Sequence, residues 1–401
     1  MIERIASSRI TSVIAEHDLL DPFQSAYRTN HSLETALLRV NNDILRAMDN
    51  GKVTALVLLD LSAAFDTVDH NILLKRLKTD IGISGAALRW CESYLKNRSQ
   101  CVRVGNSSSE AVALNYSVPQ GSVLGPQWFV IYTSQVRHII QRYNLQHHVY
   151  ADDTQIYLSF DASEKAANDS IQTLEACIVE IRHWMRNNYL KLNDNKTEFI
   201  LIGSRQKLDK IKNLHIRIGD SNIAPVRQVR NLGVIMDVSS TVKSASFQIR
   251  NLGQIRKFLT PQATEQLVHA FITSRLDMGN SLLFNLPKEQ IHRLQLKQNM
   301  AARLITRTKP SAHITPILSD LHWVPVHLRI EFKILLLTYR AVNGQAPTYI
   351  TELVVPYTSS RSGLRSADKH LLTEPKTSRS WGDHEQLANL YYYIYHVIKS
   401  Y

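Results

Sequence analysis

Residues 57–66 of this 401-residue chain read Val57-Leu58-Leu59-Asp60-Leu61-Ser62-Ala63-Ala64-Phe65-Asp66, an apolar run that reaches a carboxylate. A second acidic turn, Tyr150-Ala151-Asp152-Asp153, lies between two segments of alternating polarity. Such alternation predicts two β-strands, and it places the aspartate pair at the tip of a β-hairpin. Phosphoryl transfer needs two divalent cations about 3.5–4 Å apart, held by oxygen ligands on rigid elements. The two turns therefore predict the metal site of a nucleotide polymerase.

A third segment lies between the two acidic turns and reads Ser117-Val118-Pro119-Gln120-Gly121-Ser122-Val123-Leu124-Gly125-Pro126. Its glycines allow the backbone to approach a ligand closely, and Gln120 can hydrogen-bond a base or a sugar edge. Taken alone, an aspartate after an apolar run is usually a turn residue, and an aspartate pair usually belongs to a solvated loop. The third segment, in this order along the chain, favours the polymerase interpretation over those structural ones.

In this order, Asp60, Pro119-Gln120-Gly121 and Tyr150-Ala151-Asp152-Asp153 resemble the motifs of reverse transcriptases. More narrowly, residues 59–70 and 118–126 are similar to LINE-type retrotransposons, which lack long terminal repeats, and to their jockey-like members. Residues 188–198 and 231–234 continue the same pattern. The resemblance covers residues 1 to about 384, and the ordered set of motifs makes it far more specific than any single motif.

The resemblance implies an α+β right-hand polymerase, in which an antiparallel sheet forms the palm and helices form the thumb. On that pattern we expect partial fingers at 1–52, the palm at 53–240, the thumb at 241–310, a mostly helical region at 311–384 and a divergent tail at 385–401. The family's endonuclease domain and the basic segment before its fingers have no counterpart in this sequence. We therefore expect a partial, truncated copy of such an element.

The same resemblance implies the metal ligands and an acid catalyst. Asp60 and Asp152 would bridge two Mg²⁺ ions, for which Mn²⁺ is an alternative, and the backbone carbonyl of Leu61 would complete one coordination shell. Asp153 would be a weaker ligand. Lys196 would protonate the departing pyrophosphate as a general acid.

Four residues take nucleotide-binding roles by resemblance. Arg28 would contact the incoming triphosphate, because its planar guanidinium donates two hydrogen bonds to phosphate oxygens. Phe65 would block a ribose 2′-hydroxyl, and Gln120 and Gly121 would lie against the nucleotide. For Arg28 the alternative is a surface arginine in a loop, and for Phe65 it is an ordinary core phenylalanine. Ala26 replaces the glycine usual in the family, a mild departure if its backbone angle is ordinary.

Contacts with primer and template are expected in the later part of the chain. Leu232 and Gly233 belong to a stretch that matches the family. Residues 288–309 combine an apolar stripe with Lys and Arg side chains and a single acid. In a thumb, Arg293, Lys297 and Arg303 would grip the template–primer backbone. The alternative is a solvated helix face that binds nothing.

Composition agrees with a nucleic-acid partner. The chain has 47 Lys and Arg against 35 Asp and Glu, a net charge of +12, and a basic surface attracts polyanions. The expected partners are an RNA template, a DNA primer and deoxynucleoside triphosphates, with the element RNA bound as a ribonucleoprotein. The sequence shows neither an apolar run that could span a membrane nor a secretory signal. Neither membrane nor export is expected.

Cys91, Cys101 and Cys177 show no ligand spacing and no disulfide framework, so we expect all three to be core residues. The same observation predicts a reducing, intracellular compartment, which is the nucleus or the cytoplasm.

Periodicity predicts a helix near 33–47, an amphipathic helix within 162–191 and a buried helix at 332–339. It also predicts strands at 53–60, 198–203, 214–219 and 231–236.

The function expected from these features is RNA-directed DNA synthesis by a retrotransposon nucleotidyltransferase. One alternative is a non-catalytic relic that binds nucleic acid through the basic thumb, while incomplete fingers fail to close on a nucleotide. Another is an RNA polymerase of the same palm architecture. Phe65 and the Tyr150-Ala151-Asp152-Asp153 form disfavour the RNA polymerase.

Overall fold

The computed structural model describes residues 1–62, 64–211, 214–219, 221–226, 230–232, 234–235, 238–284, 286–356 and 372–373. The chain divides into two compact units. Unit 1 comprises Met1–His31 and Gly51–Val226, and unit 2 comprises Ser32–Asn50 and Arg227–Tyr401. The subdomain boundaries expected from the sequence stay a prediction.

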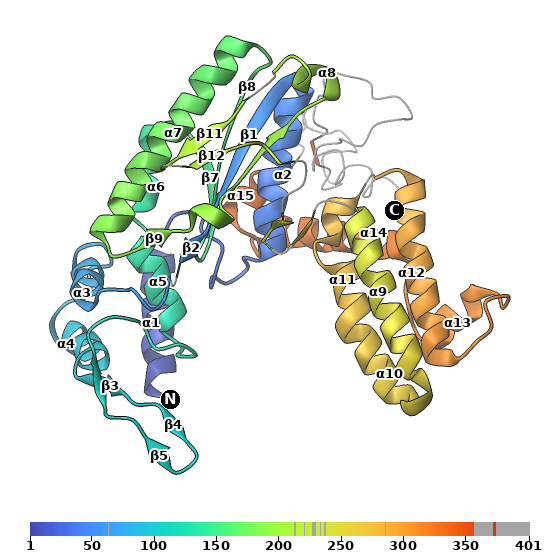
Figure 1. Cartoon of the computed structure of the whole chain (residues 1–401), viewed down its shortest axis with the longest axis horizontal. Coiled ribbons are helices and arrows are strands. Elements are labelled where there is room, and N and C mark those ends of the chain that lie inside the picture. Colours follow the sequence, from blue (N-terminus) through green and yellow to red (C-terminus); the bar gives the residue numbers. More distant parts are fainter. Residues whose placement is uncertain are drawn as a thin grey trace, which may run out of the picture. The chain divides into compact units, whose positions relative to one another are not determined.

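The centre of unit 1 is a four-stranded antiparallel sheet with the strand order β10-β1-β8-β7 (Figure 1). Its strands are β1 Lys52–Leu59, β7 Gln146–Tyr150, β8 Asp153–Asp161 and β10 Glu198–Ile202. Strand β1 is central, and Val57 pairs with Ile156 on one side and Phe199 on the other. A central strand must be apolar on both faces, which is why residues 53–59 read as an almost unbroken apolar run.

The strands β7 and β8 form the predicted hairpin. Tyr150 pairs with Asp153, so Ala151 and Asp152 alone form the turn between them. A two-residue hairpin turn needs positive φ, and Ala151 has a φ of 59°. The acidic pair therefore lies at the end of a rigid ladder.

Three helices of unit 1 contribute side chains to the same core as the sheet: α5 Gly125–Thr133, α6 Val136–Arg142 and α7 Glu164–Asn187 (Figure 1). Helix α7 is the predicted amphipathic helix. Its expected apolar stripe is buried, and its members are Ile171, Leu174, Ile178, Ile181 and Met185. The Ser163 hydroxyl caps the helix by accepting a hydrogen bond from the Ala166 amide.

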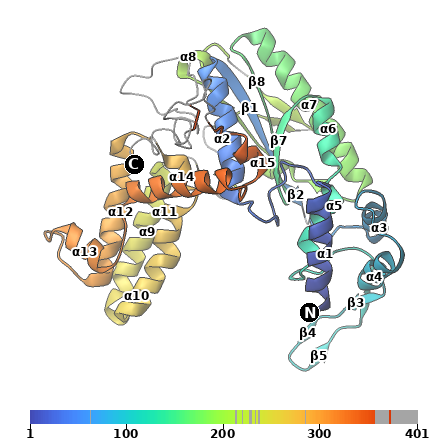
Figure 2. The same cartoon turned by 180° about the vertical axis from the view of Figure 1, so that it is seen from behind.

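The other elements of unit 1 add further side chains to this core or lie around it. Its helices are α1 Ile2–Glu16, α3 His70–Thr79, α4 Gly85–Leu95 and α8 Arg205–Leu208, with the single turn η1 Asp194–Lys196. Short ladders join β2 Leu61–Ser62 to β9 Lys191–Leu192, β3 Arg98–Gln100 to β6 Val112–Leu114, β4 Arg103–Val104 to β5 Ser107–Ser108, and β11 Ile216–Ile218 to β12 Ser221–Ile223. Figure 2 shows the β4–β5 hairpin beyond α4, and its turn consists of Gly105 and Asn106.

Two expectations for unit 1 are corrected. Cys101 is exposed rather than in the core, whereas Cys91 and Cys177 are buried. The reason is that Cys101 lies in a thin hairpin insertion whose neighbouring strands are themselves exposed. The predicted strand at 214–219 is part of the separate β11–β12 hairpin and does not join the main sheet.

Unit 2 is built of helices around a second core. Helix α2 Leu33–Asp49 begins with a capping box, because the Ser32 hydroxyl accepts from the Thr35 amide while the Thr35 hydroxyl accepts from the Ser32 amide. Further elements are β13 Arg230–Asn231, β14 Val234–Ile235, α9 Val238–Ile255, η2 Arg256–Phe258, α10 Pro261–Val268, η3 His269–Thr273, α11 Ser274–Asp277, η4 Asn280–Leu283, α12 Lys288–Thr306, α13 Ile314–Asp320, α14 Val326–Val342 and α15 Thr348–Thr351. Helices α9, α10 and α12 lie side by side (Figure 1).

The predicted buried helix at 332–339 is only partly buried. Helix α14 buries Ile330, Ile334 and Thr338 at helical spacing, whereas Phe332 is 65% exposed and Tyr339 is 62% exposed. The two aromatic residues fall on another face of the helix, because a helix in a small bundle packs one stripe and leaves the other faces outside. Among the described residues, every helix is too short or too polar to span a lipid bilayer.

Candidate active site

Three carboxylates meet at one end of the central sheet. Asp60 directly follows β1, and the β1–β8 ladder ends with Leu59 opposite Thr154, one residue from Asp153. Burial raises the pKa of Asp152, and the nearby Asp60 carboxylate raises it further. Two segments about 90 residues apart in the chain thus bring their acidic side chains together, as the sequence predicted.

The carboxylates repel one another strongly when no cation is present. Burial, followed by the charges of Asp152 and Asp60, raises the pKa of Asp153 to about 6. The Lys196 ammonium opposes this shift, and its Nζ lies 3.4 Å from Asp60 Oδ2. Asp60 Oδ2 is buried, and within the described part of the chain it accepts no hydrogen bond. An oxygen in this state is suited to a cation.

The donor set fits a divalent ion that takes its remaining ligands from a substrate. In the residues that the structure describes, no three His, Cys, Asp or Glu side chains are grouped so that they could hold a metal by themselves. Mg²⁺ in phosphoryl-transfer sites is held by one or two carboxylates together with substrate phosphates and water, so a complete protein cage is not required. Hard carboxylate oxygens also match Mg²⁺ or Mn²⁺ rather than softer metals.

The backbone around Asp60 is fixed by a short ladder. The Asp60 carbonyl accepts a hydrogen bond of 2.9 Å from the Asn193 amide, and Leu61 pairs with Leu192 in the next position. The side chain of Leu61 is 7% exposed. Because Lys196 follows this ladder in η1, the same pairing that orients Asp60 also brings the lysine to it. The lysine side chain itself is 67% exposed, so it is accessible to a ligand.

Phe65 follows Asp60 by five residues in the chain, and its side chain packs against the core of unit 1. Its ring is half-buried against the ring of the fully buried Phe129, with centroids 4.7 Å apart. The Phe65 carbonyl accepts a hydrogen bond of 3.1 Å from the Val118 amide, which joins the first motif to the segment of residues 117–126. A half-buried ring at this position is consistent with both a sugar gate and core packing.

Gln120 belongs to the segment of residues 117–126 and bonds to the first motif. Its Nε2 donates to Asp66 Oδ1 at 2.9 Å, and both side chains are exposed. Gly121 has a φ of 78° with open space around its α-carbon, so the turn requires glycine for its backbone angle. The close approach occurs instead at Gly125, where a Cβ would lie 2.7 Å from Ser122 Oγ. Asp66 binds the glutamine, in agreement with a turn-shaping role.

Arg28 is engaged within its own loop. Its Nη1 donates to the Asp21 carbonyl at 2.7 Å and to the Gln24 carbonyl at 3.1 Å. The left-handed backbone angle of this loop falls on Tyr27, with a φ of 58°, and not on Ala26. The replacement of glycine by Ala26 therefore imposes no strain.

Two side chains that shape this region were missed from the sequence. Glu3 Oε1 accepts hydrogen bonds from the Tyr94 hydroxyl and from the Val123 and Leu124 amides, so it ties α1 to the segment that ends in α5. Burial alone would raise the pKa of Glu3, but these hydrogen bonds lower it below its ordinary value. The second is Gln24, whose side chain accepts a hydrogen bond from the Ala151 amide in the turn of Ala151 and Asp152, the proposed catalytic turn. A lone Glu or Gln that bonds to groups 91 to 127 residues away gives no local signal.

The residues expected to bind primer and template lie in unit 2. On α12, Arg293 Nη1 donates to Ser239 Oγ at 3.4 Å, and Arg303 Nη2 donates to the Ala312 carbonyl at 3.1 Å. Lys297 is half-buried, and within the described part of the chain its ammonium makes one long contact, with Met300 Sδ. Leu232 is buried with a φ of 48°, and Gly233 lies outside the described residues. Arg293 and Arg303 therefore already donate to groups of unit 2, and their contact with nucleic acid stays a prediction.

Comparison with known proteins adds independent information. Residues 1–236 match the family model described as reverse transcriptase (RNA-dependent DNA polymerase). The chain is 28% identical over 200 residues to the "Probable RNA-directed DNA polymerase from transposon BS" of Drosophila melanogaster, covering 49% of this chain and 21% of that protein. It is 25% identical over 325 residues to the corresponding polymerase of the X-element of the same species, covering 76% and 34%.

The chain spans about a fifth to a third of the length of these curated relatives. Among solved structures, an apo telomerase of Candida tropicalis matches with a TM-score of 0.44 and 11% identity over 86% of this chain and 58% of that one. That similarity is too low to bear on the site. The family model, in contrast, covers more than half of the chain and includes all three carboxylates. The chain belongs to the reverse transcriptase (RNA-dependent DNA polymerase) family.

Proposed function

We propose that this chain is an RNA-directed DNA polymerase of a LINE-type retrotransposon, which adds deoxynucleotides to a primer 3′-hydroxyl. The observation that carries the proposal is the group of three carboxylates at one end of the sheet. Asp60 Oδ2 is buried with Lys196 Nζ at 3.4 Å, and burial with the neighbouring charges raises the pKa of Asp153 to about 6. Such a site is built to receive cations.

Asp60 and Asp152 would hold two Mg²⁺ ions, or Mn²⁺ in their place, with Asp153 as a weaker ligand and the Leu61 carbonyl completing one shell. When bound, the ions would lower the pKa of the primer 3′-hydroxyl and neutralise the departing pyrophosphate. The rigid hairpin and strand end keep the ligand oxygens in place, so that little reorganisation is needed when the substrate arrives.

The other side chains bind, select and transfer protons. Lys196 is exposed beside Asp60 and would donate a proton to a pyrophosphate oxygen, which lowers the charge on the leaving group. Phe65 would exclude a ribose 2′-hydroxyl, with Phe129 behind its ring to prevent it from moving aside. Gln120 and Gly121 would lie along the nucleotide.

The proposed partners are an RNA template, a DNA primer and deoxynucleoside triphosphates, together with the element RNA in a ribonucleoprotein. The net charge of +12 supports a polyanionic partner, because it raises the local concentration of nucleic acid at the surface. Leu232 and Gly233, with Arg293, Lys297 and Arg303, are the proposed contacts with the primer and template. The proposed site of action is inside the cell, in the nucleus, the cytoplasm or both.

A second candidate is a relic that binds nucleic acid without catalysis. The arrangement of Arg28 favours it, because the guanidinium already donates to the Asp21 and Gln24 carbonyls. For catalysis, the same side chain must use its remaining donors for a triphosphate or leave its loop. Arginine has five N–H donors, so contact with the loop does not by itself preclude contact with phosphate.

The test is extension of a DNA primer on an RNA template by the purified full chain with Mg²⁺ and deoxynucleoside triphosphates. The proposal predicts template-dependent extension that Asp152→Asn abolishes. Binding of the primer–template without extension, under conditions in which a known reverse transcriptase is active, would support the relic.

A further inference from the structure

The loop of residues 21–28 forms a short parallel extension of the sheet in unit 1. Gln24 bridges to Val149 of β7, the strand that leads into the catalytic turn. The Ser25 amide donates to the Val149 carbonyl at 3.0 Å, and the Val149 amide donates to the Phe23 carbonyl at 2.9 Å. The loop that carries Arg28 is therefore hydrogen-bonded to the strand beside the metal site.

Buried polar side chains hold this extension. Asp21 Oδ2 lies 2.6 Å from Nε2 of His147, and both side chains are almost completely buried. Ser25 Oγ lies 2.8 Å from Nε2 of His148, and the ring of Phe23 packs edge-on against both imidazoles. Burial alone would raise the pKa of Asp21, but the contacts with His147 lower it below its ordinary value. The loop is thus fixed along two successive residues of β7.

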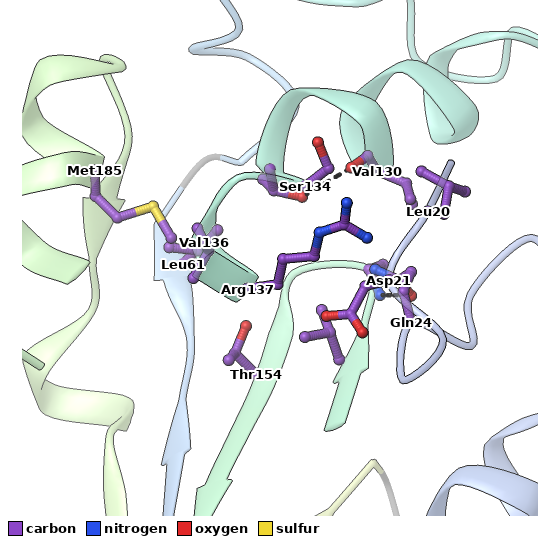
Figure 3. A pocket seen from close by; sticks show the side chains of 13 residues that line it. Leu20, Asp21, Gln24, Leu61, Val130, Ser134, Val136, Arg137, Thr154 and Met185 are labelled. Carbon is purple, nitrogen blue, oxygen red and sulfur yellow. Dashed lines mark hydrogen bonds between the residues drawn. The ribbon is translucent and has the colours of Figure 1, made fainter. Parts of the chain in front are cut away.

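Gln24 connects this loop to the catalytic turn directly. Its side chain is 4% exposed, and Oε1 accepts hydrogen bonds from the Ala26 amide at 2.8 Å and from the Ala151 amide at 3.3 Å. Its backbone carbonyl accepts from Arg28. Figure 3 shows Gln24 beside Asp21 on the wall of a small pocket that is too small for a nucleotide, with Arg137 extending across it. Gln24 therefore contacts both the arginine and the turn.

We infer that Gln24 is a positioning residue that holds the backbone of Ala151 so that Asp152 points into the metal site. An alanine at φ 59° lies in the left-handed region, which side chains with a Cβ disfavour, so the turn needs support. Oε1 supplies it by pairing the buried Ala151 amide, which would otherwise lose its partner. Because Asp152 is the next residue, a change in the backbone angles of Ala151 moves the Asp152 carboxylate. This inference rests on the proposed function of Asp152.

Gln24→Met in the full chain removes the acceptor while keeping the length and volume of the side chain. The matched control is Ser25→Ala in the same loop. It removes the hydroxyl that contacts His148 of β7 and leaves the bond to the Ala151 amide in place. We expect hydrogen exchange at the Ala151 amide to become about tenfold faster or more in Gln24→Met and to stay unchanged in Ser25→Ala, because only the first loses a bond to that amide.

A second readout is Mn²⁺ affinity, measured by electron paramagnetic resonance without substrate. We expect Gln24→Met to bind Mn²⁺ about tenfold more weakly, and primer extension to lose kcat more than KM for the nucleotide, since misplacement by about 1 Å is costly in catalysis. Adding Ala151→Gly to Gln24→Met should restore the Mn²⁺ affinity and kcat in part, because glycine adopts positive φ without penalty. A purely structural role of Gln24 predicts no such rescue.

The outcomes separate this inference from the proposed function. Normal exchange at Ala151 and normal Mn²⁺ affinity in Gln24→Met would overturn the inference even if the parent chain is an active polymerase. Faster exchange and weaker Mn²⁺ binding in Gln24→Met, with no extension by the parent, would refute the proposed function and leave the inference standing. If Gln24→Met fails to fold, Gln24→Asn keeps the amide but is too short to reach both donors, and the same exchange result is expected from it.

Discussion

The catalytic turn of unit 1 and helix α12 of unit 2 hold their charged groups in opposite ways. Around the turn, Asp60, Asp152 and Asp153 are half-buried at strand ends, and burial together with the neighbouring carboxylates raises the pKa of Asp152 and of Asp153. On α12, Arg293 and Arg303 are spread along a long helix and donate to groups of their own unit. The first arrangement keeps like charges close together, which lowers the stability of the fold. In the second, both guanidinium groups already have hydrogen-bond acceptors in their own unit.

This difference shows which charges are held for a ligand. A cluster of repelling carboxylates needs a proton or a bound cation to relieve the repulsion, so its presence in a folded unit indicates a function. A run of basic residues on a helix is stable by itself, since each long side chain can reach solvent or a neighbouring carbonyl. The contrast predicts large effects for changes at the turn and graded effects for changes on α12.

The strongest test of the contrast is removal of one charge at the turn. Asp152→Asn or Asp60→Asn keeps the shape of the side chain but weakens its hold on Mg²⁺, so primer extension should fall roughly a thousandfold or more. Single-turnover extension on an RNA template measures this. Asp66→Asn is the matched control, because Asp66 is exposed and bonded to Gln120. Near-normal extension by Asp152→Asn would refute the metal site, and an equal loss at Asp66 would add that residue to it.

The carboxylate cluster should also be visible in stability against pH. Asp153 has a pKa raised to about 6, so the folded, metal-free chain still binds its proton at pH values where the unfolded chain has released it. Stability therefore falls as pH rises from about 4 to 6 and stays lower above that window. Asp153→Asn removes this cost and should raise the free energy of unfolding of unit 1 by roughly 1–3 kcal/mol at pH 8, with little change at pH 4.

Urea unfolding with a chelator present, followed at both pH values, checks this prediction. Saturating Mg²⁺ should reverse the sign of the effect at pH 8, because the cation stabilises the ionised cluster of the parent chain and not that of the variant. An equal gain at pH 4 and pH 8 would mean that Asp153 does not carry the raised proton affinity.

A smaller effect is expected at Phe65, where packing and selection are combined. Phe65→Ala should raise the ratio of ribonucleotide to deoxyribonucleotide incorporation by about ten- to a hundredfold, the range for adding or removing a small group in a pocket. The loss of the stacked partner of Phe129 should also lower stability. Phe65→Tyr keeps the aromatic wall and should keep the ratio. A Phe65→Ala variant that is less stable but equally selective would assign the ring to core packing alone.

Much of the catalytic turn could be predicted because it depends on local pattern. The alternation on both sides of Asp152 predicted the hairpin, and the apolar run before Asp60 predicted a strand, which the structure places next to β8 at the centre of the sheet. The buried stripe of α7 followed from its helical spacing in the same way. These features need only the residues next to one another and the rule that apolar faces turn inward.

The contacts that orient the site could not be predicted, because they join distant segments. Gln24 reaches Ala151 across 127 residues, and Glu3 reaches Val123 across 120. The errors have the same origin. Cys101 and Phe332 are apolar residues, and only the tertiary structure decides that no second layer covers them. Arg303 looked like a free cation until the fold brought the Ala312 carbonyl to it.

The smallest expected effects concern α12, and they test the other side of the comparison. Lys297 has the least committed charge of the three proposed contacts, so Lys297→Ala should reduce the slope of log affinity against log salt by about 0.9 for duplex primer–template. Arg303→Ala should change the slope less, because its guanidinium also donates to the Ala312 carbonyl. The loss should be similar for different template sequences, since phosphate contacts position the duplex without reading it.

Filter binding across a salt series measures these slopes, and Leu296→Ala is the matched control, an exposed residue of α12 without charge. An unchanged slope in Lys297→Ala would show that the basic residues of α12 are merely solvated. A full reduction in Arg303→Ala would mean that the arginine leaves the Ala312 carbonyl for phosphate, so that α12, like the catalytic turn, is held ready for its ligand. If the slopes change as expected while the parent chain extends no primer, the relic becomes the better account, because binding through α12 does not require the carboxylates.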